Sequence, residues 1–140
     1  MAGEILVPTK GGKASDDAVT LACTLARSRK SKIRIIHVIE VERTLPLDAE
    51  LEPELRRGEE VLSRAERIGR ENNCPVETEL LQAREVGPAI VDEASERGVD
   101  LIIMGIDYKR RFGEFELGKT VPYVLKHAPC QVWLCREAAG

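Results

Sequence analysis

Short apolar segments alternate along this chain with longer segments in which apolar residues recur at helical spacing. The short segments are rich in Ile, Val and Leu, as is typical of strands buried in a parallel sheet. In the longer segments, Val19, Cys23 and Ala26 illustrate the apolar stripe of an amphipathic helix. The pattern predicts strands at residues 4–8, 32–41, 76–82, 101–104 and 131–135, and helices from Ser15 onward and at residues 51–72, 88–97 and 119–127.

Local signals predict where the helices begin and end. The pair Gly11-Gly12 interrupts the chain after the first strand. Ser15 is then predicted to cap the first helix. Pro88 at the start and Gly98 at the end bracket the helix at 88–97.

Regular alternation of strand and helix predicts a single α/β domain spanning residues 1–140. Its core is expected to be an open five-stranded, mainly parallel sheet with helices on both faces and right-handed crossovers. Segment 76–82 alternates apolar and polar residues, which indicates an edge or half-buried strand. Ligands of such sheets bind beyond the carboxyl ends of the strands, where the strand order reverses. In this chain that rim comprises residues 9–12, the turn after Val38, and residues 105–118.

Composition narrows the class of protein. The chain has 140 residues, a net charge of −3 and only 4% aromatic residues, so no nucleic-acid partner is expected. It contains no apolar run long enough to span a membrane, so direct membrane insertion is not expected and a cytoplasmic protein is. The four cysteines form no C-x-x-C pair, and neither zinc nor redox chemistry is expected of them.

Several segments resemble the universal stress protein family. They are the strands ILVPT, IIHVIE and LIIMG and the closing segment HAPCQVWLC, and the resemblance extends over essentially the whole chain. It implies a Rossmann-like fold of the adenine nucleotide alpha hydrolase type. It also implies a homodimer that forms through the terminal strand from Gln131 to Cys135, where Trp133 is a candidate interface anchor.

Members of that family that bind ATP contain Gly-x2-Gly-x9-Gly-Ser/Thr after the fourth strand and an Asp after the first. Gly105 and Gly118 match the first and third glycines, but Tyr108, Lys119 and Lys10 replace the second glycine, the hydroxyl residue and the Asp. Tyr108 cannot give the close backbone approach that glycine gives. The resemblance therefore implies ATP binding that is weak or lost. The candidate rim residues are Pro8, Thr9, Lys10, Val38, Met104, Gly105, Tyr108, Gly118, Lys119 and Thr120.

The cations of this rim support two interpretations. They are either solvated loop charges or part of a site altered for another anion, such as a different nucleotide. The cofactor therefore stays open, with ATP or another nucleotide as candidates. Gly113-x4-Gly118-Lys119-Thr120 also matches the P-loop expression, but a P-loop should start at the strand end near Gly105, and Glu114 and Glu116 would repel a phosphate.

No catalytic constellation or metal-ligand cluster is predicted. His37 lies within an apolar strand and is expected to be packed or hydrogen-bonded rather than catalytic. The first hypothesis is therefore a non-enzymatic regulatory or binding protein. The alternatives are an ATP- or AMP-binding protein with slow ATP hydrolysis through Gly105, Gly118 and Thr120, and a docking subunit of a transporter.

Overall fold

A computed structural model describes residues 3–107, 110–111, 114–115 and 117–136, with backbone only at 110–111 and 114–115. One sheet contains β1 (Glu4–Pro8), β2 (Lys32–Glu40), β3 (Glu77–Ala83), β4 (Leu101–Ile106) and β7 (Gln131–Arg136). Its order is β3-β2-β1-β4-β7 and every pairing is parallel. The helices are α1 (Lys13–Arg29), α2 (Glu52–Glu71), α3 (Val86–Arg97) and α4 (Thr120–His127). The predicted five-stranded α/β fold is confirmed, and the strand at 76–82 is an edge strand as expected.

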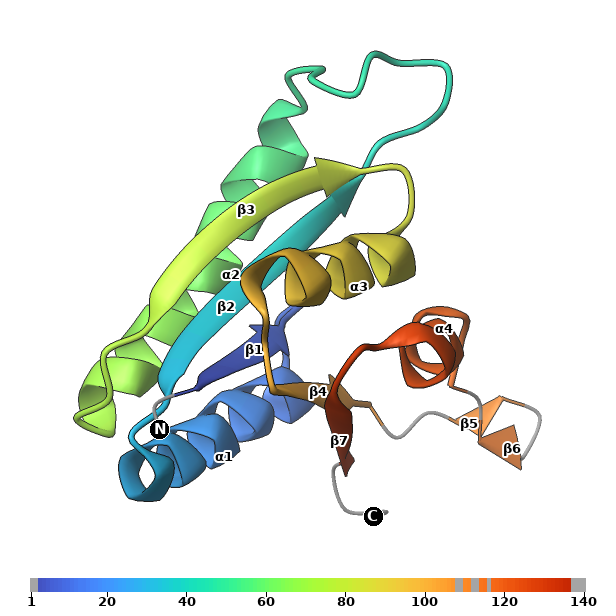
Figure 1. The fold of residues 1–140 in the computed structure, drawn as a ribbon. Helices are drawn as coiled ribbons and strands as arrows, with labels where there is room; N and C mark the ends of the chain where they lie inside the picture. Colours follow the sequence, from blue (N-terminus) through green and yellow to red (C-terminus); the bar gives the residue numbers. More distant parts are fainter. Residues whose placement is uncertain (1–2, 108–109, 112–113, 116, 137–140) are drawn as a thin grey trace.

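Two layers of helices enclose the sheet (Figure 1). Helices α1 and α2 cover one face, and α3 and α4 cover the other. Successive residues of the central strands point to opposite faces, so Ile5 and Ile35 are buried under α1 and α2 while Leu6 and Ile36 are buried under α3. This double burial explains why consecutive residues in the middle of these strands, such as Ile35 and Ile36, are both apolar.

Two predicted helix starts were wrong. Helix α1 begins at Lys13, after Gly12 as the N-cap residue with φ 93°, and Ser15 is buried inside its first turn. The glycines at 11 and 12 both have positive φ, so the backbone turns into the helix before Ser15 is reached. Helix α3 begins at Val86, because proline is tolerated in a first helical turn and Pro88 therefore does not mark its first residue.

The sequence analysis did not predict a two-stranded antiparallel hairpin, which is made of β5 (Arg110–Arg111) and β6 (Glu114–Phe115). It lies between β4 and α4, and its second strand, β6, falls inside the formal P-loop match. The backbone at Glu114–Phe115 therefore pairs with a neighbouring segment and does not lead directly from a buried strand into a helix, as a P-loop does.

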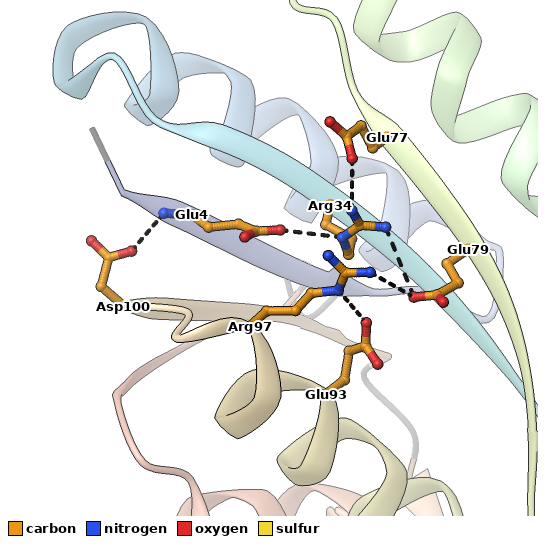
Figure 2. A network of polar contacts seen from close by, with 7 residues as sticks. All are labelled: Glu4, Arg34, Glu77, Glu79, Glu93, Arg97 and Asp100. Carbon is orange, nitrogen blue, oxygen red and sulfur yellow. Dashed lines mark hydrogen bonds and ion pairs between the residues drawn. The ribbon is translucent and has the colours of Figure 1, made fainter.

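A polar network fixes α3 against the sheet (Figure 2). Arg34 of β2 donates to Glu4 at 3.2 Å and to Glu77 at 2.6 Å, and Arg97 of α3 donates to Glu93. Oε1 of Glu79 lies 3.8 Å from Arg34 and 3.7 Å from Arg97, so the two guanidinium groups meet at this carboxylate. Glu93 and Arg97 both lie in the carboxyl half of α3, so the network joins this half of the helix to β2 and β3.

The two inward-facing carboxyls of this network influence each other. A hydrogen bond with Glu93, together with burial, raises the pKa of Glu79. Burial alone would raise the pKa of Glu93, but hydrogen bonds from Glu79 and Arg97 outweigh it and lower that pKa. At intermediate pH, Glu93 is therefore the stronger acid of the pair and Glu79 the one that retains a proton.

Candidate functional site

A pocket of about 740 Å³ opens at the carboxyl end of the sheet. It lies where the strand order reverses, because β1 continues to β2 on one side while β4 continues to β7 on the other. We call it the rim pocket, and its lining residues are Pro8, Thr9, Lys10, Ser15, Ile36, Val38, Val86, Ile90, Met104, Gly105, Ile106, Asp107, Leu117, Gly118, Lys119, Thr120 and Val121.

One wall of the rim pocket is apolar and the other is polar. Ile36 and Val38 of β2 and Ile90 of α3 belong to the apolar wall. Lys119 and Thr120, at the amino end of α4, belong to the polar one. A pocket with this division suits a ligand that has a flat apolar part and a charged part.

The turn after β1 is held by its own side chains. Thr9 Oγ1 accepts a hydrogen bond from the backbone N–H of Gly11 at 3.2 Å, and Ser15 Oγ accepts one from Lys10 N–H at 3.4 Å. Nδ1 of His37 donates to the carbonyl of Thr9 at 2.8 Å, because that oxygen can only accept. His37 therefore has the hydrogen-bonded position that was expected. Two backbone N–H groups of this turn are already paired and are less available to an anion.

Gly105 is required by helix packing. A Cβ atom built at this position would lie 2.7 Å from the backbone nitrogen of Ser15 and closer still to the carbonyl oxygen of Ala14. The first turn of α1 thus rests directly on the backbone of β4. Glycine is needed at position 118 for a different reason. No atom lies within 4 Å of the place where a Cβ would be, but the φ of Gly118 is 70°. It is required for the left-handed turn that leads into α4.

An ion pair joins the two loops at the mouth of the rim pocket. Nζ of Lys10 lies 3.4 Å from Oδ2 of Asp107, the residue that follows β4. The Lys10 side chain is 64% exposed and the Asp107 side chain 26%, so solvent screens the pair and its energy is small. Lys10 was considered a candidate ligand for a phosphate, but in this structure a carboxylate already neutralises much of its charge.

The structure brings together nine of the ten candidate rim residues, and the tenth, Tyr108, lies outside the described residues. Whether they bind a ligand stays a prediction. Eight lining residues were not among the candidates: Ser15, Ile36, Val86, Ile90, Ile106, Asp107, Leu117 and Val121. Asp107 does lie in the segment 105–118 that was expected to form the rim. Asp107 could have been found as the first residue after a buried strand. The α3 residues gave no such signal, because only the packing of α3 brings them to this end of the sheet.

Two kinds of feature are absent from the described part of the chain. None of its helices is long and apolar enough to cross a membrane. In the same residues, no three His, Cys, Asp or Glu side chains are grouped so that they could hold a metal ion.

Comparisons with known proteins agree with this geometry. The model of the universal stress protein family matches residues 1–136. A universal stress protein of Methanocaldococcus jannaschii is 28% identical over 140 residues, which cover 96% of this chain and 82% of that protein. The structure of a universal stress protein from Archaeoglobus fulgidus is 25% identical, with a TM-score of 0.75 and coverage of 94% of this chain and 92% of that one.

A structure of the Archaeoglobus fulgidus universal stress protein in complex with dAMP is 21% identical. Its TM-score is 0.73 and the match covers 96% of this chain and 97% of that one, which at this identity shows the fold alone. The match to the family model covers nearly the whole chain. This chain belongs to the universal stress protein family.

Proposed function

We propose that this protein is a non-enzymatic regulatory protein that binds an adenine mononucleotide in the rim pocket and binds ATP weakly or not at all. The main support is the pocket itself, which combines about 740 Å³ of space with one apolar and one polar wall. In this arrangement the base lies against Ile36 and Val38, and the phosphate lies at the amino end of α4, near Lys119 and Thr120.

The charges of the rim favour one phosphate over three. The ammonium of Lys10 is paired with Asp107, so the two together add little net positive charge to the pocket mouth. Further phosphates of ATP would extend along this mouth and meet the Asp107 carboxylate, whereas a single phosphate needs only the α4 terminus and Lys119. The dAMP complex of the Archaeoglobus fulgidus protein, a family member of the same fold, contains a nucleotide with one phosphate.

Calorimetric titration of the purified protein with AMP, and separately with ATP and magnesium, tests the proposal. Saturable binding of AMP is expected, with ATP weaker by about tenfold or more, which corresponds to about 1.4 kcal/mol. The Lys119→Met variant should lose much of the AMP affinity, while Lys126→Met, at the other end of α4, should not. Absence of heat with AMP, or ATP binding tighter than AMP, would overturn the proposal.

The same preparations test the non-enzymatic part. Phosphate release from ATP in the presence of the protein should equal the rate in buffer alone. The wild type could instead release phosphate faster than buffer does. If Lys119→Met abolishes this excess and Lys126→Met retains it, the alternative of slow ATP hydrolysis in this pocket is favoured.

We also propose a homodimer that pairs through β7, which is an edge strand. Trp133 is 38% exposed and Leu134 is 40% exposed, on opposite faces of that strand. An apolar edge of this kind favours pairing with a second copy. Light scattering should report a dimer for the wild type and a monomer for Trp133→Glu. The control Leu125→Glu, which replaces a more exposed apolar residue on α4, should stay dimeric. A Trp133→Glu protein that remains dimeric would rule out this interface.

A further inference from the structure

A second pocket, of about 370 Å³, lies at the opposite end of the sheet from the rim pocket. It is formed where α1 leads into β2 and where α2 leads into β3, and it shares no lining residue with the rim pocket. We call it the thiol pocket, and it is lined by Cys23, Ala26, Arg27, Ser31, Lys32, Ile33, Asn73, Cys74, Pro75, Val76 and Glu77.

Two cysteines that are far apart in the sequence meet in the thiol pocket. Cys23 is fully buried in α1, and Cys74 is partly exposed in the turn after α2. Cys74 packs against the same apolar cluster that contains Cys23, and the two thiols interact through a hydrogen bond. The pocket therefore holds one thiol that solvent reaches and a second thiol directly behind it.

The turn that contains Cys74 is held firmly in place. Its N–H donates to the carbonyl of Gly69 at 2.8 Å, and Asn73 has a left-handed φ of 51°. A Cβ at Gly69 would lie 2.6 Å from the Cys74 carbonyl oxygen, so the turn rests directly on α2. Arg27 of α1 donates to the carbonyl of Asn72 at 2.7 Å, which ties this turn to the helix that contains Cys23.

The environments of the two thiols set the order in which they meet an oxidant. Burial, together with the neighbouring Cys74 thiol, raises the pKa of Cys23 to about 12, so Cys23 stays protonated at neutral pH. Cys74 is the thiol that an oxidant in the pocket reaches first. Arg27 and Lys32 line the same pocket and supply positive charge where hydroxide leaves when a peroxide reacts.

We propose that Cys23 and Cys74 are a redox pair that forms a reversible intramolecular disulfide when the protein meets hydrogen peroxide. The Cys74 thiolate attacks one peroxide oxygen, the O–O bond breaks, hydroxide leaves, and Cys74 becomes a sulfenic acid. The Cys23 sulfur then attacks the Cys74 sulfur, the S–O bond breaks, and the Cys23 proton leaves with the hydroxyl group as water. In total two thiols are oxidised to one disulfide and one peroxide is reduced to two waters. A small thiol reverses the bond by exchange.

This disulfide would join α1 to the turn between α2 and β3. The rim pocket lies at the other end of the same helices and strands, so nucleotide binding is not required for the bond to form. Failure of the nucleotide proposal would therefore leave this one unaffected.

The full-length protein, first fully reduced, should be treated with a small excess of hydrogen peroxide and alkylated. A digest analysed by mass spectrometry without reduction should contain a Cys23–Cys74 linked peptide. The intact protein should lose the mass of two hydrogen atoms, run as a monomer on a denaturing gel, and return to its original mass with dithiothreitol. Thiol titration should fall from four accessible groups in denaturant to two.

Two variants serve as a matched pair. Cys74→Ser should abolish the link, and Cys130→Ser, which removes another partly exposed thiol, should leave it intact. Three outcomes would overturn the proposal: no linked peptide in the wild type, a link between two protein chains, or sulfinic acid at Cys74 while Cys23 stays reduced. Each is measured on the wild-type protein, so none depends on how a variant folds.

Discussion

Gly105→Ala gives the sharpest test of how the candidate site is built. The added methyl group would lie 2.7 Å from Ser15 N and closer still to Ala14 O, and both are backbone atoms that cannot rotate away. The first turn of α1 must therefore move away from β4 by the better part of an ångström. That movement loosens the contact of α1 with the sheet, where Ala18 and Ala22 are fully buried.

Overpacking of a well-packed core typically lowers the free energy of unfolding by about 1–3 kcal/mol. Because the added methyl group clashes with two backbone atoms, Gly105→Ala should lie at the upper end of this range, at about 3 kcal/mol. For a chain of this size, that corresponds to a fall in melting temperature of about 10 °C. Urea unfolding followed by circular dichroism would measure both the midpoint and the free energy. A fall in nucleotide affinity in this variant would follow from the displaced helix.

Gly98→Ala is the matched control. Unlike Gly105, Gly98 has a positive φ, of 62°, and nothing lies within 4 Å of the place where its Cβ would be, so Gly98→Ala costs only the backbone strain of about 1 kcal/mol. The reasoning is refuted if Gly105→Ala unfolds at the same urea concentration as Gly98→Ala or as the wild type. That outcome would mean that α1 can shift on the sheet without loss.

Three further changes have definite expected outcomes. The pKa of Glu79 is raised in the folded protein, so the stability that its protonated carboxyl contributes is complete below the pKa of a free Glu and is lost as pH rises through the folded-state pKa. Gln cannot lose a proton in this way. In urea unfolding, Glu79→Gln should therefore gain stability relative to the wild type as pH rises from 4 to 7. Arg84→Ala removes hydrogen bonds to three carbonyls of the loop after β2, and limited trypsin digestion should then cleave faster after Arg43; unchanged cleavage would mean that other contacts hold the loop. Tyr108→Gly should strengthen ATP binding if the rest of the rim fits the nucleotide, and calorimetry that shows no gain would place the obstacle elsewhere in the pocket.

Much of the fold follows from patterns that are local in the sequence. In the strands at 4–8 and 101–104 every residue except Glu4 is apolar, because both faces of these strands are covered, and this is visible without a structure. Helix ends were less certain. Ser15 is a good N-cap residue, yet the positive φ of the two glycines before it starts the helix earlier.

The rim was predicted from the rule that loops at the carboxyl ends of parallel strands converge. That rule locates Thr9, Gly105 and Gly118 but says nothing about their contacts. Gly105 is a motif position in the sequence, whereas the structure shows that α1 itself requires it. The partner of Lys10 could not be predicted either, because Asp107 follows a strand almost a hundred residues later.

The sequence by itself determined the α/β class, the order of elements and the end of the sheet where a ligand would bind, since each depends on periodicity and on turn residues within a few positions. Only the tertiary structure decided which distant side chains meet. Glu79 with Glu93, Lys10 with Asp107 and Cys23 with Cys74 are each joined by the strand order and by how a helix packs on the sheet. The physical reason is that a contact between distant residues depends on where whole elements lie in space. The residues next to either member of such a pair in the sequence do not indicate where these elements lie.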